Sequence, residues 1–292
     1  SETLLDRILR DEWGFDGLVV SDWSAVKNTE ASAKVGLDVD MGVTPNFDDY
    51  YFARPLLEAV RDGRVSEADV DRKVEHVLAV MDALNMLGDA RAARKAGSYA
   101  TLAHAQAALD VARESIVLLK NSAGVLPLDE HGTKRLLIIG ANADRIHSLG
   151  GGSAVIKAVH EISPLLGING MLGGNVDITY AEGYWAPQVN QDDTWQEDSL
   201  ENSEQDATAE AERTRRLRDE ALALAREFAA SGDPIIFIGG LNHDYDLEAR
   251  DRTTMDLPYE QDALIDALLD IDPNAVLVFV GGSPVAMPWE PK

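Results

Sequence analysis

The sequence contains no cysteine, which excludes disulfide bonds, thiolate metal ligands and a cysteine nucleophile. Its six histidines are scattered and form no HExxH pair, so we expect no zinc site, and nothing else in the sequence points to a metal or a cofactor. No apolar run is long enough to cross a membrane.

Basic residues are also scarce, since 26 Lys and Arg face 51 Asp and Glu, which gives a formal net charge of -25 and a pI near 4.4. This balance argues against nucleic acid and anionic membranes as partners and predicts a well-solvated surface. With 292 residues and a hydrophobic content of 45%, the chain can form sizeable cores in more than one domain.

The two ends suggest a piece of a longer protein. The chain opens with Ser1 and enters a helical pattern at once, and it stops at Lys292 just after a strand-like run. We expect a fragment of a longer soluble enzyme. Whether it is cytoplasmic, periplasmic or secreted stays open, because an incomplete N-terminus would hide a signal peptide. The oligomeric state also stays open, a homo-oligomer included.

Residues 1–88 alternate helical and strand-like patterns. Ser66, with Asp69 three residues later, predicts the start of a long helix whose apolar positions keep helical spacing. The small and polar residues that follow predict a linker at 89–105. The expected elements are helices up to residue 13 and at 31–35, 55–62 and 67–87, and strands at 18–20 and 36–41.

The alternation restarts near residue 102 and predicts a second domain over 106–292. Strands that alternate with helices indicate a mostly parallel sheet covered by helices, so the expected fold class is α/β. The expected elements are helices at 102–120, 209–229 and 260–270, and strands at 136–140, 176–180, 235–239 and 275–280.

Two tempting motifs fail on their spacing. Residues 150–153 read GGGS, but a Walker loop needs Gly-Lys-Ser/Thr and a dinucleotide fingerprint needs GxGxxG directly after a strand. The alternating acids at 244–248 resemble calcium ligands, yet Ala249 and Met255 stand where a calcium loop needs Gly and Glu. We therefore expect neither nucleotide nor calcium binding.

The stretch GFDGLVVSDWS, at residues 14–24, ends a strand of buried type in an aspartate, Asp22. One interpretation makes Asp22 the N-cap of a helix that begins at residues 24–26, because Asp is a favoured capping residue. The other makes Asp22 a catalytic carboxylate at the end of the strand. The stretch by itself favours neither.

A second acidic stretch, residues 240–258, follows the expected strand at 235–239 and so lies at the carboxyl edge of a parallel sheet, where α/β folds place ligands. Glu248 stands there among Asp244, Asp246 and Asp251. Crowded carboxylates raise a pKa, as a general acid requires, although a glutamate in a loop is usually just solvated.

The segment WGFDGLVVSDW resembles the nucleophile segment of family 3 glycoside hydrolases, the beta-glucosidase family. In such enzymes a (β/α)8-type TIM barrel is followed by an α/β sandwich, with the active site between them. The resemblance makes residues 1–88 the end of the barrel and residues 106–292 a sandwich domain without its final portion. Other motifs of the family follow in order along nearly the whole chain: GLDVDM (36–41), LLEAVRDGRVSEADVDRKV (56–74), ESIVLLKNSAGVLPL (114–128), IGANAD (139–144), GGGSA (150–154), EARDRTTMDLP (248–258) and GGSPVAMPW (281–289).

By this resemblance Asp22 is the catalytic nucleophile at the C-terminal end of a late barrel strand. Trp23 would form part of the wall that contacts the sugar, unless it packs beneath the loop. The ExxDR pattern of the family places the general acid/base at Glu248. Asp246 is the alternative, because this loop reads Glu-Ala-Arg where the family more commonly has Glu-Gly-aromatic.

The function implied by the resemblance is that of a retaining, exo-acting beta-glycosidase, in the first place a beta-glucosidase of carbohydrate metabolism such as cellulose degradation. It would release terminal glucosyl residues from a beta-linked oligosaccharide or glycoside through a covalent glycosyl-enzyme. A beta-xylosidase of the same family and a silent, sugar-binding fragment are the alternatives. The N-terminal half of the barrel, which would hydrogen-bond the sugar, is expected to be required for activity.

Overall fold

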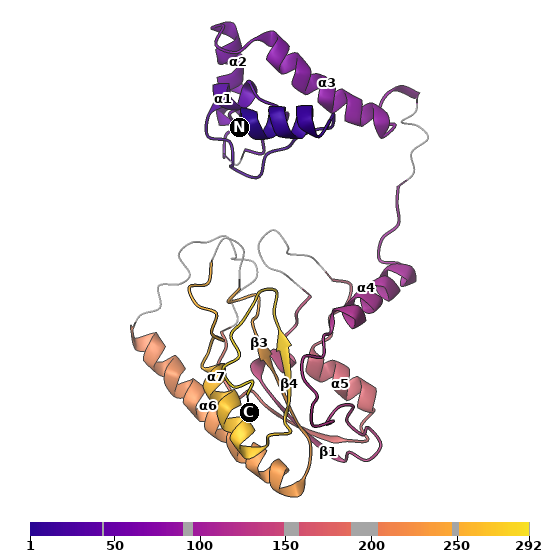
Figure 1. Cartoon of the computed structure of the whole chain (residues 1–292), viewed down its shortest axis with the longest axis vertical. Coiled ribbons are helices and arrows are strands. Elements are labelled where there is room, and N and C mark those ends of the chain that lie inside the picture. Colours follow the sequence, from indigo (N-terminus) through magenta and orange to yellow (C-terminus); the bar gives the residue numbers. More distant parts are fainter. Residues whose placement is uncertain (43, 90–95, 149–157, 188–203, 247–250, 292) are drawn as a thin grey trace. The chain divides into compact units, whose positions relative to one another are not determined.

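The computed structural model describes residues 1–42, 44–89, 96–148, 158–187, 204–246 and 251–291. The chain forms two compact units, Ser1–Tyr99 and Ala100–Lys292 (Figure 1). Each unit has its own core of buried apolar residues. No described helix combines the length and the apolar character needed to span a bilayer.

The first unit is mainly helical around a small core. That core consists of Ala33, Leu56, Ala59 and Val65, with Phe52, Val60 and Val70 against it. The expected helix after Ser66 is confirmed, because the Ser66 hydroxyl accepts the Asp69 N–H and the Asp69 carboxylate accepts the Ser66 N–H, both at 3.2 Å. The elements are η1 (Thr3–Glu12, with π-helical hydrogen bonding), α1 (Thr29–Ala33), η2 (Phe47–Asp49), α2 (Arg54–Arg61) and α3 (Glu67–Ala83).

The two strands expected in the first unit are shorter than the sequence indicates. They pair through a single parallel bridge between Val20 and Val39. Among the described residues of this unit no further strand lies beside them, and a parallel pair gains little stability without neighbours. Val20 is accordingly exposed, although the pattern around it is that of a strand buried on both faces.

The second unit is built on a parallel sheet with the strand order β2-β1-β3-β4, so β2 and β4 form its edges among the described strands. The predicted α/β class and parallel sheet are therefore confirmed. Every predicted strand of this unit lies within one residue of an observed one. The strands are β1 (Arg135–Ile139), β2 (Asp177–Ala181), β3 (Ile235–Gly240) and β4 (Val276–Val280).

Helices cover both faces of this sheet (Figure 1). Alternate residues of β1 point to opposite faces: Leu137 and Ile139 pack with α6 and α7, whereas Leu136 and Ile138 pack with α5. The helices are α4 (Leu102–Ser115), η4 (Ala141–Asp144), α5 (Pro164–Leu172, which was not predicted), α6 (Glu204–Ser231) and α7 (Gln261–Ile271).

The helix predicted over 102–120 ends earlier than expected. α4 stops at Ser115, and Ile116 continues in an extended conformation. The next residues include β-branched side chains, which lose rotamer freedom in a helix. Ile116, Val117, Leu118 and Leu119 are all exposed in this structure.

Candidate active site

Asp22 lies at the end of the paired segments of the first unit. Val19 O accepts the N–H groups of Asp38 at 2.9 Å and Val39 at 3.2 Å, and Val39 O accepts the Ser21 N–H at 2.9 Å. The Ser21 hydroxyl oxygen accepts the Met41 N–H at 2.9 Å. These bonds hold the chain up to the residue before Asp22, and two residues after Asp22 the Ser24 N–H returns to Met41 O at 2.9 Å.

The Asp22 carboxylate is exposed and does not cap a helix. Its Oδ1 accepts the Trp23 N–H at 2.7 Å, and its carbonyl accepts the Ala25 N–H at 3.2 Å, which closes a tight turn. Helix α1 begins only at Thr29, and its N-cap is Asn28. The capping interpretation of Asp22 is therefore wrong, and the carboxylate is left available for chemistry.

Trp23 follows directly and is 59% exposed, so it does not pack beneath the loop within its own unit. An exposed indole beside an exposed carboxylate is the arrangement expected of a sugar-binding wall, because the apolar face of the ring suits the C–H surface of a sugar. Its contact with a sugar stays a prediction.

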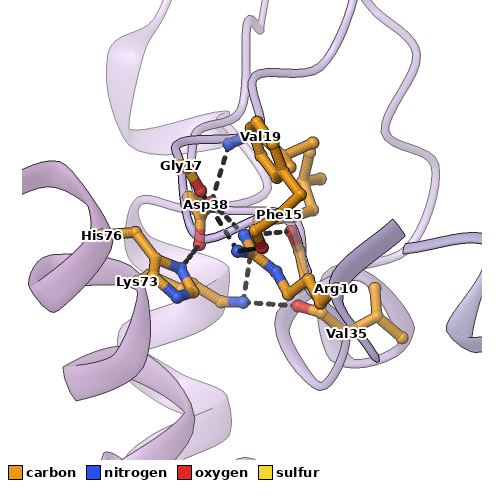
Figure 2. Close-up of polar contacts among 10 residues, drawn as sticks. Arg10, Phe15, Gly17, Val19, Val35, Asp38, Lys73 and His76 are labelled. Carbon is orange, nitrogen blue, oxygen red and sulfur yellow. Dashed lines mark hydrogen bonds and ion pairs between the residues drawn. The ribbon is translucent and has the colours of Figure 1, made fainter. Parts of the chain in front are cut away.

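A buried ionic cluster contacts Gly17 and Val19, at the start of the segment that ends in Asp22 (the Asp22 segment), and the sequence patterns did not predict it (Figure 2). Asp38 is its centre, and Arg10, Lys73 and His76 contribute from η1 and α3. The one signal that could have found it is the motif GLDVDM, which places Asp38 in the second paired segment. Its partners are 28 to 38 residues away along the chain, and no local pattern identifies them.

An apolar cavity of about 350 Å³ lies between residues 38–40 of the second paired segment and helix α3. Lys73 lines it and has a lowered pKa, chiefly because it is buried, and its Nζ donates to the carbonyls of Val35 at 2.9 Å and Leu37 at 2.7 Å. Asp40 also lines the cavity, and both of its carboxylate oxygens are buried without a hydrogen-bond partner in the described part of the chain.

In the second unit, polar residues gather where β1 and β3 end. The strand order changes direction between these neighbours, and such a point is where α/β sheets bind ligands. Asn142 is fully buried and donates from Nδ2 to Leu241 O at 3.0 Å, while Arg145 forms an ion pair with Asp244. These contacts join the loop after β1 to the loop after β3.

His147 belongs to the same polar region. Its Nε2 lies 3.1 Å from Asn142 O and therefore carries the proton that donates to this carbonyl, while Nδ1 is buried without a partner among the described residues. Burial is the main reason why the pKa of His147 is lowered, and the positive charge of Arg145 acts in the same direction.

Glu248 lies outside the described residues, whereas Asp246 lies within them. The Ser283 hydroxyl donates to Asp246 Oδ2 at 2.8 Å, and Arg252 Nε lies 3.7 Å from Asp246 Oδ1. Arg252 also donates to Ser283 Oγ at 3.0 Å and Pro284 O at 2.7 Å. Asp246 thus joins the loop after β3 to the segment after β4 directly through Ser283, and indirectly through Arg252 of its own loop.

The described residues define a two-unit α/β chain with an exposed carboxylate at the end of a strand segment and an acidic loop at the carboxyl edge of a parallel sheet. The chain belongs to glycosyl hydrolase family 3. The N-terminal domain of that family matches residues 1–80, and its C-terminal domain matches residues 116–292.

Relatives in the family include beta-glucosidases and also exo-alpha-(1->6)-L-arabinopyranosidases of Bifidobacterium. The beta-glucosidase BoGH3A of Bacteroides ovatus is 35% identical over 97% of this chain and 37% of its own length. The thermostable beta-glucosidase B of Acetivibrio thermocellus is 34% identical over 99% of this chain and 33% of its own length. A solved beta-glucosidase from Erythrobacter marinus superposes with a TM-score of 0.71 at 30% identity, covering 98% of this chain and 39% of that one. The chain thus spans between 33% and 39% of these relatives.

Proposed function

We propose that this chain carries the two catalytic carboxylates of a retaining, exo-acting beta-glycosidase whose preferred sugar is glucose. The observation that carries the proposal is the exposed Asp22 carboxylate, free of any capping role, with the exposed Trp23 beside it. Membership of the family supports the reaction type, and the relatives named beta-glucosidases support the sugar.

In this mechanism the two carboxylates act in turn on one glycosidic bond. Asp22 attacks the anomeric carbon and forms a glycosyl ester, while Glu248 gives its proton to the departing oxygen. Glu248 then takes a proton from water, whose oxygen attacks the anomeric carbon and releases Asp22 and the sugar with retained configuration. Retention requires that the two carboxyl groups stand ~5 Å apart in the active enzyme.

The longer protein is proposed to supply further residues that activity requires. The chain spans no more than 39% of the relatives described above. The buried Asp40 oxygens lack a partner in the described part of the chain, and native proteins rarely leave such groups unsatisfied. An N-terminal barrel half that packs against the cavity beside Asp40 would supply a donor to this carboxylate.

A mechanism-based label tests the proposal. The chain is mixed with the separately expressed N-terminal half, treated with an activated 2-deoxy-2-fluoro glucoside and digested for peptide mass spectrometry. We expect one label, on Asp22, and none in Asp22→Asn. The matched control Asp16→Asn, an exposed aspartate of the same stretch, should be labelled normally. A label on another residue would refute the assignment, and faster labelling by the xyloside analogue would refute glucose as the sugar.

A further inference from the structure

The Asp38 carboxylate ties together three separate parts of the first unit (Figure 2). Its side chain is only 1% exposed. Oδ2 accepts from Arg10 Nη2 and from the Val19 N–H, each at 2.8 Å, and Oδ1 lies 2.7 Å from His76 Nδ1. Since a carboxylate only accepts, His76 Nδ1 is the donor. Asp38 thereby links η1, the Asp22 segment and α3.

Of these bonds, the one to Val19 reaches the segment that carries Asp22. A parallel ladder extended beyond the Val20–Val39 bridge would pair the Val19 N–H with Leu37 O. That carbonyl is occupied by Lys73 Nζ at 2.7 Å, and the Leu37 N–H turns back to Val35 O at 2.8 Å. The ladder therefore stops, and the Asp38 side chain takes the place of the next rung.

Arg10 also binds the backbone of both paired segments. Its guanidinium donates to Gly17 O at 3.1 Å and to Gly36 O at 3.0 Å, the carbonyls two residues before Val19 and Asp38. Its side chain is 13% exposed, so its charge depends on Asp38 for compensation. One buried ion pair thus braces the starts of both paired segments, three residues ahead of Asp22.

We propose that Asp38 is a positioning residue for the Asp22 nucleophile, an inference that rests on the function proposed above. The Asp22 segment has a single strand bridge, and the hydrogen bonds on either side of Asp22, from the Ser21 N–H to Val39 O and from the Ser24 N–H to Met41 O, also run to the segment that begins at Asp38. Without the Asp38 carboxylate, the Val19 N–H and the Arg10 charge lose their partner, and the segment can shift. A displacement of ~1 Å at a reacting group costs on the order of a hundredfold in rate.

The test must separate positioning from folding, so rates are divided by the number of competent sites. An activated 2-deoxy-2-fluoro glucoside releases one aryl leaving group per site in the enzyme reassembled from both halves. We expect Asp38→Asn to lower kcat per titrated site on the order of a hundredfold, and to slow labelling in parallel, with KM little changed. The matched control Asp62→Asn removes an exposed carboxylate paired with Arg64 in the same unit and should keep the full rate per site.

A second variant keeps the test decisive if Asp38→Asn does not fold. Asp38→Glu retains the charge opposite Arg10, but its extra methylene displaces the oxygen that receives the Val19 N–H. We expect it to fold and to lose rate per site as well. A structural role alone would lower the count of titrated sites and leave the rate of each unchanged, and that result in either variant overturns the inference. A label on a residue other than Asp22 in the unaltered enzyme would instead refute the proposed function.

Discussion

Gly240 is a position at which one added methyl group should strongly disturb the second unit. It ends β3 with a φ of +106°, and a Cβ placed there would lie 2.2 Å from Val280 O of the neighbouring strand. The backbone cannot retreat easily. Gln261, itself fully buried, accepts the Gly240 N–H at 2.8 Å and donates to Gly240 O at 2.9 Å. Val280 O is also the acceptor for the Leu241 N–H at 2.8 Å.

Three substitutions of the same kind separate the contributions. Gly170 lies exposed in α5 with open space around it, so Gly170→Ala should raise the free energy of unfolding by about 0.5–1 kcal/mol. Gly232 has a φ of +73° but also open space, so Gly232→Ala should lower it by about 1 kcal/mol. Gly240→Ala combines the same backbone strain with overpacking against β4, which adds about 1–3 kcal/mol, so it should cost about 2–4 kcal/mol in all.

Urea unfolding followed by tryptophan emission measures this series. Trp289 is buried, stacks on Phe279 of β4 with ring centroids 5.0 Å apart and donates to Asp262 at 2.8 Å, so its emission reports the second unit. Trp13 and Trp23 of the first unit are exposed and should change little. If Gly240→Ala and Gly232→Ala differed by less than about 1 kcal/mol, the close approach to β4 would not be the reason for glycine at position 240.

Three further predictions concern the catalytic assignments and the dependence on pH. In the reassembled enzyme, Glu248→Ala should impair substrates with poor leaving groups far more than activated aryl glucosides and be rescued by azide. The same pattern in Asp246→Ala alone would transfer the acid/base role to Asp246. The pKa of His147 is lowered in the folded chain, so the unfolded chain binds a proton near pH 6.5 that the folded chain does not. The free energy of unfolding therefore falls as the pH drops through this value, by at most about 1.4 kcal/mol per pH unit. In thermal unfolding between pH 8 and pH 5, His147→Gln should remove this pH-dependent loss of stability, whereas the control substitution His131→Gln, at an exposed position, should leave it in place. The same pH dependence in His147→Gln and in the unaltered chain would refute the role of His147. Residues 1–292 alone should hydrolyse an aryl beta-glucoside negligibly and gain activity when the N-terminal half is added, whereas full activity of the isolated chain would contradict the need for that half.

The sheet of the second unit could be predicted because its signals are local. The runs at β1 and β3 are apolar on both faces, as strands buried between helix layers must be, and the structure places both faces in contact with helices. The capping box at Ser66 is equally local, since its two residues are three apart. The same logic overstated the strands of the first unit, because the pattern around Val20 indicates burial that no described neighbour provides.

The candidate site was only partly predictable for the opposite reason. Asp22 stands out because a carboxylate directly follows a strand-like run, and its environment agrees with a chemical role. Nothing near Asp38 in the sequence identifies Arg10 or His76 as its partners, since these contacts form only when η1 and α3 fold onto the paired segments. Local pattern points to the proposed nucleophile, whereas the groups proposed to position it are brought together only by tertiary packing.

The position of β4 at one edge of the sheet has a consequence for how the chain behaves at high concentration. The strand reads VLVFV, carries no charge and exposes Val278, and no described strand pairs with its outer side. Such an edge is a template for pairing with a second molecule. The net charge of -25 keeps molecules apart at low ionic strength, but salt shortens the range of that repulsion to about 8 Å at 0.15 M. Self-association of this chain should therefore increase with added salt.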